Sequence, residues 1–323
     1  MILDQVDKRQ DVGEIIVTLF EYCNLSCKFC NQDHNDLLGT DTITQKIELV
    51  QQEIKRLNKK SYSVHFMGGE VFADSLPDQV FYDYNYVVNE INKWSRKEGY
   101  DVELCFTTNF VFTNTSRLDK LLAATGIKLL TSYDPSARFN KNTFKIFREN
   151  VERYKHNIKS VNVIMTKPSI KKFMNNDVPF FDTLYDLFGI YFDYYTPEKN
   201  MDMFLPTDVM LRDFMIYMLD KYPKVLPFSE MKNKMKKKMS CMDTITIMPN
   251  GSKGACTILL KGFKKPNVKK VAMEEEWFEQ YQCLTCDHFQ YCNMGCFLSN
   301  HIQSFRTQEA CYLSEVYDVV HAN

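Results

Sequence analysis

Three cysteines in the segment CNLSCKFC are the residues of this chain best suited to metal chemistry. Cys23, Cys27 and Cys30 follow the spacing C-x-x-x-C-x-x-C. Three thiolates on one loop can converge on a cube of iron and sulfide, which normally takes four cysteines. The fourth iron would then stay open to another ligand, as a catalytic zinc keeps one position for water or substrate. The alternative is a structural zinc ion with His34 as its fourth ligand.

Seven further cysteines gather near the end of the chain, and only Cys105 stands apart from both groups. The seven are Cys241, Cys256, Cys283, Cys286, Cys292, Cys296 and Cys311. C-x-x-C pairs suit tetrahedral zinc as well as iron-sulfur clusters, so zinc-ribbon-like structural sites are the alternative there. Cys105 lies in the strand-like run VELCFTT, where we expect a buried thiol that acts as a small apolar residue.

Composition places the chain among ordinary globular proteins. It has 323 residues, 45% of them hydrophobic, and a formal net charge of −1. This balance gives no field that would favour nucleic acid or a membrane surface. The amino-terminal segment is polar and acidic and no run of apolar residues is long enough to span a bilayer, so we expect a cytoplasmic protein. In that reducing compartment, eleven cysteines favour metal or redox chemistry over disulfides.

Strand-like and helix-like segments alternate six times and must position the first thiol group. The expected strands cover 14–20, 62–69, 102–107, 127–133, 161–166 and 190–195. The expected helices cover 43–57, 79–96, 116–124, 142–156 and 178–188. Such alternation implies parallel strands with right-handed crossovers, in an open sheet or a barrel.

Unusual residues fall where these strands end. In parallel α/β folds the chemistry gathers at the carboxyl ends of strands. The cysteine loop follows the first strand, and the next three strands end at the residues Gly68, Gly69, Glu70, Thr108, Asn109, Ser132 and Asp134. We therefore expect a single site on one rim of the sheet.

The first thiol segment also has a family resemblance. CNLSCKFC resembles the cysteine motif of the radical S-adenosylmethionine (radical SAM) superfamily, and FMGGE resembles its glycine-rich segment, over residues 14 to about 195. The resemblance implies that Cys23, Cys27 and Cys30 ligate a [4Fe–4S] cluster whose open iron chelates S-adenosylmethionine. It also implies one-electron reduction of that cofactor to methionine and a 5′-deoxyadenosyl radical, which removes a hydrogen atom from the substrate.

Other residues have expected roles around S-adenosylmethionine. Phe29 is an apolar ring suited to packing against adenine. Gly68 and Gly69 would let the backbone approach the methionyl group, and Glu70 would stabilise the local charge or turn. Four positions resemble the ribose- and carboxylate-binding residues of the family, with ordinary turn chemistry as the alternative: Asn109, Ser132, Asp134 and Arg138.

The spacing of the second cysteine group resembles that of the SPASM domain, which carries auxiliary iron-sulfur clusters. TITIMPNGSKGAC also predicts the opening hairpin of that domain. The resemblance implies one fully ligated cluster at Cys283, Cys286, Cys292 and Cys311. It implies a second at Cys241, Cys256 and Cys296, whose remaining position is an open iron, a non-cysteine ligand or a substrate group. With the first site, this makes three [4Fe–4S] clusters.

The fold class that we expect is α/β: a partial (β/α)6 TIM-like barrel with a small cysteine-rich carboxyl-terminal iron-sulfur domain. Residues 1–200 would form the barrel, 201–235 a bridging helical segment and 236–323 the SPASM domain. Since the cysteine motif begins at residue 23, we expect substrate recognition by the barrel mouth, the bridge or the tail.

The expected activity is that of a radical SAM/SPASM maturase, which crosslinks, epimerises or oxidises a ribosomally made peptide or a protein side chain. The alternatives are a small-molecule radical SAM dehydrogenase or isomerase and, last, a non-enzymatic zinc or iron-sulfur protein. Sulfatase-maturing relatives carry Asp after the cysteine matching Cys256, and Thr257 here counts against that activity. The expected partners are this substrate and an electron donor such as flavodoxin or ferredoxin.

Two further features concern the substrate. Asp193, in the last expected strand, could face the cavity and remove a proton from the substrate. The lysine runs KNKMKKK and KGFKKPNVKK are either solvated loops or a cationic rim that draws an acidic peptide toward the barrel.

Overall fold

A computed structural model describes residues 12–30, 32–195, 202–233, 244–254, 256, 283–289, 291–292 and 311–322. Its centre is an eight-stranded sheet in the order β6-β5-β4-β3-β2-β1-β7-β8. The strands are β1 (Val12–Thr18), β2 (Ser61–Met67), β3 (Asp101–Thr108), β4 (Lys128–Ser132), β5 (Ile158–Met165), β6 (Gly189–Tyr194), β7 (Thr244–Ile247) and β8 (Lys253–Gly254). Neighbours from β6 to β7 are parallel and only β7 and β8 pair antiparallel.

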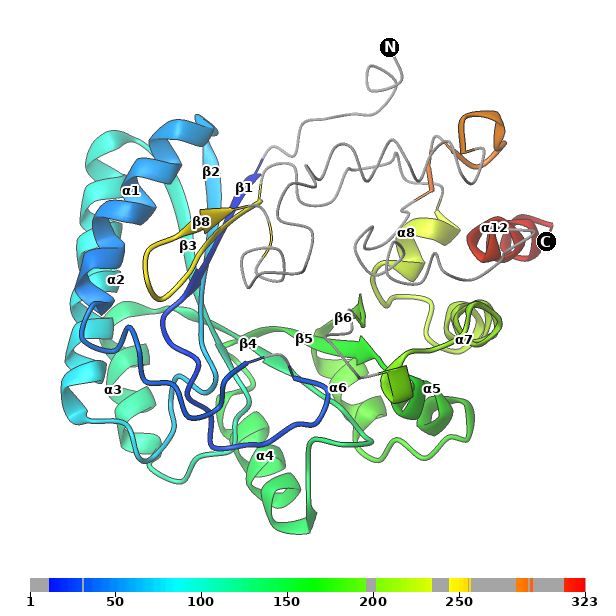
Figure 1. The fold of residues 1–323 in the computed structure, drawn as a ribbon, viewed down its shortest axis with the longest axis horizontal. Helices are drawn as coiled ribbons and strands as arrows, with labels where there is room; N and C mark the ends of the chain where they lie inside the picture. Colours follow the sequence, from blue (N-terminus) through cyan, green and yellow to red (C-terminus); the bar gives the residue numbers. More distant parts are fainter. Residues whose placement is uncertain are drawn as a thin grey trace.

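Helices cover the outside of the curved sheet (Figure 1). They are α1 (Lys46–Leu57), α2 (Asp78–Glu98), α3 (Thr115–Thr125), α4 (Lys141–Tyr154), α5 (Lys167–Met174), α6 (Phe181–Leu187), α7 (Asp208–Lys221), α8 (Phe228–Lys232) and α12 (Tyr312–His321). Short 3-10 turns lie at Ile43–Gln45, Asp202–Phe204 and Cys283–Thr285. The first six strands and their crossovers confirm the expected α/β class and partial barrel.

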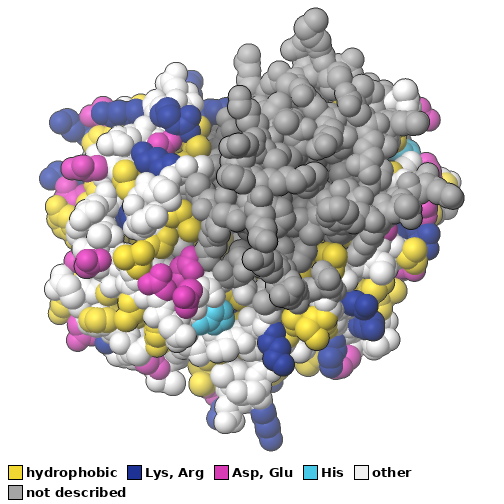
Figure 2. All heavy atoms as spheres, in the orientation of Figure 1, with side chains coloured by type: hydrophobic (Ala, Val, Ile, Leu, Met, Phe, Trp, Pro, Cys, Tyr) yellow, Lys and Arg dark blue, Asp and Glu magenta, His cyan; other side chains and the backbone are white. Residues whose placement is uncertain are grey.

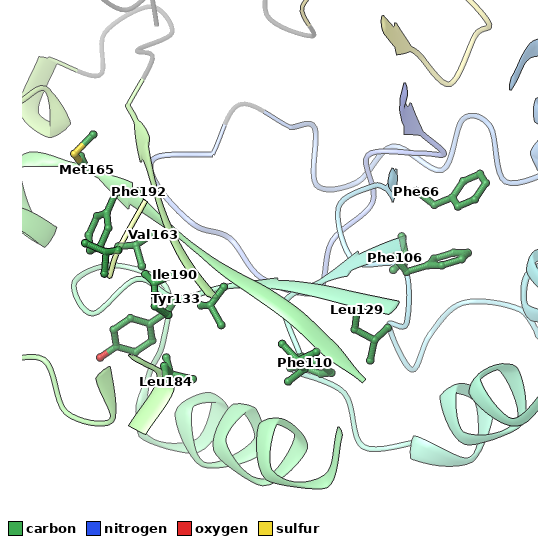
Figure 3. Packing of buried hydrophobic residues seen from close by; sticks show 14 of the residues in the cluster. Phe66, Phe106, Phe110, Leu129, Tyr133, Val163, Met165, Leu184, Ile190 and Phe192 are labelled. Atoms are coloured by element: carbon green, nitrogen blue, oxygen red, sulfur yellow. The ribbon is translucent and has the colours of Figure 1, made fainter. Parts of the chain in front are cut away.

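The core lies between this sheet and the helices (Figure 3). Alternate residues of β2 point to it: Tyr62, Val64 and Phe66 are buried and the residues between them are partly exposed. Phe66 meets Phe106 of β3 with ring centroids 5.0 Å apart. Strands of this length, buried on the helix side, hold their register because a one-residue slip would turn the apolar set away from the core.

One helix departs from the sequence expectation. A helix was expected at 178–188, but the chain forms α5 at Lys167–Met174 and then a shorter α6 at Phe181–Leu187. Thr166 caps α5 by accepting a hydrogen bond from the Ser169 backbone N–H, and Pro168 occupies the first turn. An N-cap threonine followed by proline is a helix-start pattern, so the segment TKPS did contain this information.

The expected tail hairpin is present, and it extends the main sheet. β7 pairs with β1 from Glu14 opposite Thr244 to Val17 opposite Ile247. On the helix side, the buried Lys46 of α1 donates to the carbonyl of Pro249 at 2.6 Å. The division at residue 236 stays a prediction, but part of the tail shares the sheet of the barrel.

Two surface features bear on partners. None of the helices within the described ranges combines the length and apolar character needed to cross a bilayer. On the face shown in Figure 2, basic and acidic side chains are interspersed over the described residues. That mixture agrees with the near-zero formal charge of −1.

Candidate active site

The thiol loop leaves the carboxyl end of β1 and folds back on itself. The backbone N–H of Cys23 donates to the carbonyl of His34 at 3.0 Å, and that of Cys30 to the carbonyl of Cys27 at 3.0 Å. The carboxylate of Glu21 accepts from the backbone of Asp33 at 2.8 Å. All three cysteines are partly exposed. The loop therefore presents its three thiols at the rim where the sequence placed them.

The GGE segment continues the pairing of β1 and β2 beyond the strands. The N–H of Gly69 donates to Phe20 O at 3.2 Å, and the N–H of Glu70 donates to Tyr22 O at 2.9 Å. A Cβ at Gly69 would lie 2.0 Å from the carbonyl oxygen of Tyr22, and one at Gly68 would lie 2.8 Å from Phe20 O. Glycine is therefore needed at both positions for the close pairing with the thiol loop, and the expected approach of this backbone to a methionyl group stays a prediction.

Glu70 is fully buried and links the end of β2 to the end of β3 by hydrogen bonds. Its carboxylate accepts from the Phe72 backbone at 2.9 Å, from Thr108 Oγ1 at 2.7 Å and from the Asn109 backbone at 2.5 Å. Burial raises the pKa of Glu70 to about 7, against the opposing effect of these donors. Its position supports the expected role at a turn.

The side chain of Asn109 turns toward the thiol loop. Its Nδ2 lies 3.7 Å from Cys23 Sγ and donates to Asn24 Oδ1 at 3.0 Å. Its Oδ1 accepts from the Val111 backbone at 2.7 Å. Both polar ends of the amide are thus engaged within the chain, and the expected ribose-binding role stays a prediction.

Ser132, Asp134 and Arg138 meet on the opposite side of the loop, near Cys27. The guanidinium of Arg138 donates to Ser132 Oγ. The positive charge of Arg138 lowers the pKa of Cys27, and the negative charge of Asp134 raises it, against the larger effect of burial. Asp134 Oδ1 accepts from the backbone of Ala137 at 2.6 Å, a contact that agrees with the alternative of ordinary turn chemistry. Its Oδ2 and Arg138 Nε, however, are buried and have no partner among the described residues. An ammonium and a carboxylate would complete these two groups, as an amino acid moiety does.

The ring of Phe29 is less open than expected. It is 6% exposed and packs edge-on against Phe204, with centroids 6.3 Å apart. Tyr195 completes this aromatic cluster, and Arg138 lies 5.8 Å from the Phe29 ring centroid. The segment that follows β6 thus covers the ring, a contact that the local motif could not reveal.

Cys23 and Cys27 are poor nucleophiles without a metal. Burial raises the pKa of Cys23 to about 12, and it raises the pKa of Cys27 as well. A coordinated metal deprotonates a thiol outright, so these groups suit ligands better than free nucleophiles. Within the described residues, no three Cys, His, Asp or Glu side chains converge on one point that would hold a single ion. The ring Nδ1 of His34 contacts the carbonyl of Leu25, which leaves Nε2 as the ring nitrogen that could bind a metal ion, so the zinc alternative stays open.

Asp193 lies where β5 and β6 run side by side. Its Oδ2 accepts from Asn162 Nδ2 at 2.9 Å, and the charge of Glu14 on β1 acts on it. Burial raises the pKa of Asp193 to about 7. In β6, Ile190 and Phe192 are buried and Asp193 alternates with them, so its side chain lies on the opposite face of the strand. Its expected position in the cavity stays a prediction.

The described part of the tail brings several cysteines toward β6. Cys283 and Cys292 are buried, and Cys286 and Cys311 are partly exposed. Cys292 and Cys311 are close enough to Tyr194 for their charges to raise its pKa, and the charge of Cys286 likewise raises the pKa of Cys311. Cys105 is fully buried in β3, as expected. Outside the described residues lie Cys241, Cys296, Thr257, most of the KNKMKKK run and the whole KGFKKPNVKK run.

No protein-family model matches the chain. Over 177 residues it is 20% identical to the radical SAM cyclopropyl synthase TigE of Paramaledivibacter caminithermalis, a match that covers 50% of this chain and 34% of TigE. The chain thus spans about a third of that relative's length.

Two solved structures share the fold. Native anSMEcpe with bound AdoMet has a TM-score of 0.65 and 14% identity, over 96% of each chain. Streptococcus suis SuiB has a TM-score of 0.52 and 16% identity, over 96% of this chain and 77% of that one.

Fold and loop together define the class, an α/β partial barrel with a three-cysteine loop after its first strand. The chain shares this fold with the two solved structures, and its sequence is similar over half of its length to a radical SAM enzyme.

Proposed function

We propose that the chain binds a [4Fe–4S] cluster at Cys23, Cys27 and Cys30, and S-adenosylmethionine beside it. The observation that carries this proposal is the pair of buried groups without partners near Cys27, Asp134 Oδ2 and Arg138 Nε. Arg138 would pair with the carboxylate of the methionyl group, and Asp134 would accept from its ammonium. Covered by Phe204 and Tyr195, Phe29 would help to exclude water from this corner.

When bound, the cluster supplies the electron that cleaves S-adenosylmethionine to methionine and a 5′-deoxyadenosyl radical, which takes a hydrogen atom from the substrate. We propose a peptide or protein side chain as that substrate, with a small molecule as the alternative. The likeness to TigE, a radical SAM cyclopropyl synthase, supports the radical class. A one-electron donor such as flavodoxin or ferredoxin would be the redox partner.

The tail is proposed to hold two auxiliary clusters, as in a SPASM domain. Cys283, Cys286, Cys292 and Cys311 would ligate one of them, and the nearness of the last two to Tyr194 supports a site against β6. Cys241, Cys256 and Cys296 would ligate the other.

The test is anaerobic reconstitution followed by iron and sulfide analysis. Dithionite and S-adenosylmethionine are then added, and 5′-deoxyadenosine is followed by mass. We expect about twelve irons per chain, four for each cluster, and formation of 5′-deoxyadenosine. Stoichiometric zinc, or iron without cleavage, would overturn the proposal.

Asp193 is proposed as the proton acceptor in the lumen. Its pKa of about 7 means that it is a carboxylate, able to accept a proton, above neutral pH. Product formation should therefore rise as pH passes through about 7. Asp193→Asn should abolish product formation and leave S-adenosylmethionine cleavage in place, since the proposed proton transfer comes after cleavage. Unchanged turnover in this variant rejects the role.

A further inference from the structure

The orientation of the Asn109 amide is fixed by its neighbours. Its oxygen must face Val111, because the backbone N–H there is a donor. Asn24 donates its own Nδ2 to the carbonyl of Val111, so its Oδ1 is left to face Asn109. The two amides thus determine each other, and the Nδ2 of Asn109 must point to the thiol loop.

An Asn109 N–H is therefore aimed at Cys23. The amide nitrogen has two hydrogens, of which one serves Asn24 Oδ1 at 3.0 Å and the other faces Cys23 Sγ at 3.7 Å. The backbone N–H of Leu25 reaches the same sulfur at 3.4 Å. Each of Cys23 and Cys30 also has a side-chain oxygen acceptor nearby, Asn24 Oδ1 at 4.0 Å and Gln32 Oε1 at 3.9 Å. Cys23 is thus the thiol toward which these two donors converge.

The backbone of Asn109 is fixed by hydrogen bonds from neighbouring strand ends. Its backbone N–H donates to the buried carboxylate of Glu70, which also holds Thr108. The hydroxyl of Thr131 on β4 donates in turn to the Thr108 carbonyl at 2.7 Å. Three strand ends therefore fix the point from which this amide projects, and little reorganisation is available to it.

Donors aimed at a sulfur ligand affect the cluster's redox balance. Reduction adds negative charge that spreads onto the thiolates, and an N–H donor stabilises that charge. We propose that Asn109 is a positioning residue that raises the reduction potential of the cluster at Cys23, an inference that rests on the proposed function. Glu70 acts through it by fixing its backbone.

Two substitutions at Asn109 separate this role from simple support of the loop. Asn109→Asp keeps the acceptor for the Val111 N–H and replaces the donor with an anionic oxygen; Asn109→Leu removes both. The proposal predicts the highest potential in the wild type, a lower one in the Leu variant and the lowest in the Asp variant. A purely structural role predicts the reverse order for the two variants, because Asp preserves more of the native contacts.

The measurement is an anaerobic potentiometric titration of the reconstituted full chain, followed by electron paramagnetic resonance. The titrated feature is the one that changes on adding S-adenosylmethionine. Asn150→Leu is the matched control, because the buried Asn150 donates to the carbonyls of Phe110 at 3.0 Å and Phe112 at 2.9 Å without touching Cys23. Its potential should equal that of the wild type. Circular dichroism and thermal melting check that each variant folds.

Each outcome decides a separate claim. If no resonance feature of the wild-type protein changes on adding S-adenosylmethionine, the proposed function is wrong. With that feature present, equal potentials in all four proteins overturn the role of Asn109, as does the reverse order. Loss of the cluster from both folded Asn109 variants, with retention in Asn150→Leu, also overturns it, because Asn109 would then hold the loop rather than tune it. The expected order with retained clusters supports it.

Discussion

The two groups of cysteines stand in opposite surroundings. Polar side chains surround the amino-terminal loop: Asn24, Gln32, Asn109 and Arg138 lie beside its three partly exposed thiols. Aromatic rings surround the described tail. His288 stacks on Tyr317 with centroids 5.2 Å apart, and the buried Phe289 lies between Cys286 and Cys292 in the sequence.

This difference matches two kinds of metal site. A catalytic site keeps a position open and has polar groups that orient what binds there, whereas a site with complete ligation is closed. Near the loop, Asp134 Oδ2 and Arg138 Nε are buried without a hydrogen-bond partner among the described residues. In the described tail, packed rings such as those of His288 and Tyr317 exclude solvent. This contrast supports the proposed open cluster at the loop and the proposed closed cluster in the tail.

The largest effect should come from removing one thiol of each group. Cys27→Ser should lower S-adenosylmethionine cleavage by at least about 100-fold, since losses in the outer shell of metal sites alone cost 10–100-fold. Cys286→Ser should leave cleavage within about threefold and lose about four irons, because the cluster proposed for the tail has ligands of its own. Both variants are measured by iron analysis and by 5′-deoxyadenosine. Loss of cleavage in Cys286→Ser would break the comparison.

A second prediction concerns how tightly the loop is held against β2. Gly69→Ala should lower the free energy of unfolding by about 3 kcal/mol, because its Cβ would lie 2.0 Å from Tyr22 O. Gly189→Ala on β6 is the control: its Cβ would have no neighbour within 3.7 Å, so the change should stay within about 0.5 kcal/mol. Denaturant unfolding measures both free energies. Equal losses in the two variants would mean that the loop shifts at little cost to accommodate a side chain at residue 69.

Local patterns predicted much of this arrangement. The spacing of Cys23, Cys27 and Cys30 and the period-two runs of the strands were enough to place a thiol loop at the end of the first strand. The GGE segment was placed on the same rim, since parallel strands end together. These features depend on neighbours in sequence and on one general rule of topology.

Contacts between distant segments were beyond such patterns. Phe29 is covered by Phe204, 175 positions later, and Asn109 turns to a loop that lies 86 positions earlier. Pairing of β7 with β1 likewise joins residues that are 230 positions apart. Each depends on how far the sheet curls and on where the tail docks, and neither quantity has a local sequence pattern.

The smallest effect should come from the tail hairpin. Lys46→Met should lower the free energy of unfolding by about 1 kcal/mol, since the Met248 and Pro249 carbonyls would lose a buried donor. Lys145→Met removes an exposed partner of Glu149 and should stay within about 0.5 kcal/mol. Denaturant unfolding of the two variants gives the difference. If Lys46→Met has no effect, β7 is held by its strand pairing alone.

The pairing of β7 with β1 also decides what a shortened chain would do. In the full chain β1 has β2 on one side and β7 on the other. A protein ending at Asn233 would leave one side of β1 with a row of free backbone donors and acceptors, next to the thiol loop. Such a bare edge recruits strands from other molecules. The barrel half expressed alone should therefore self-associate more than the full chain, because β7 covers this edge of β1.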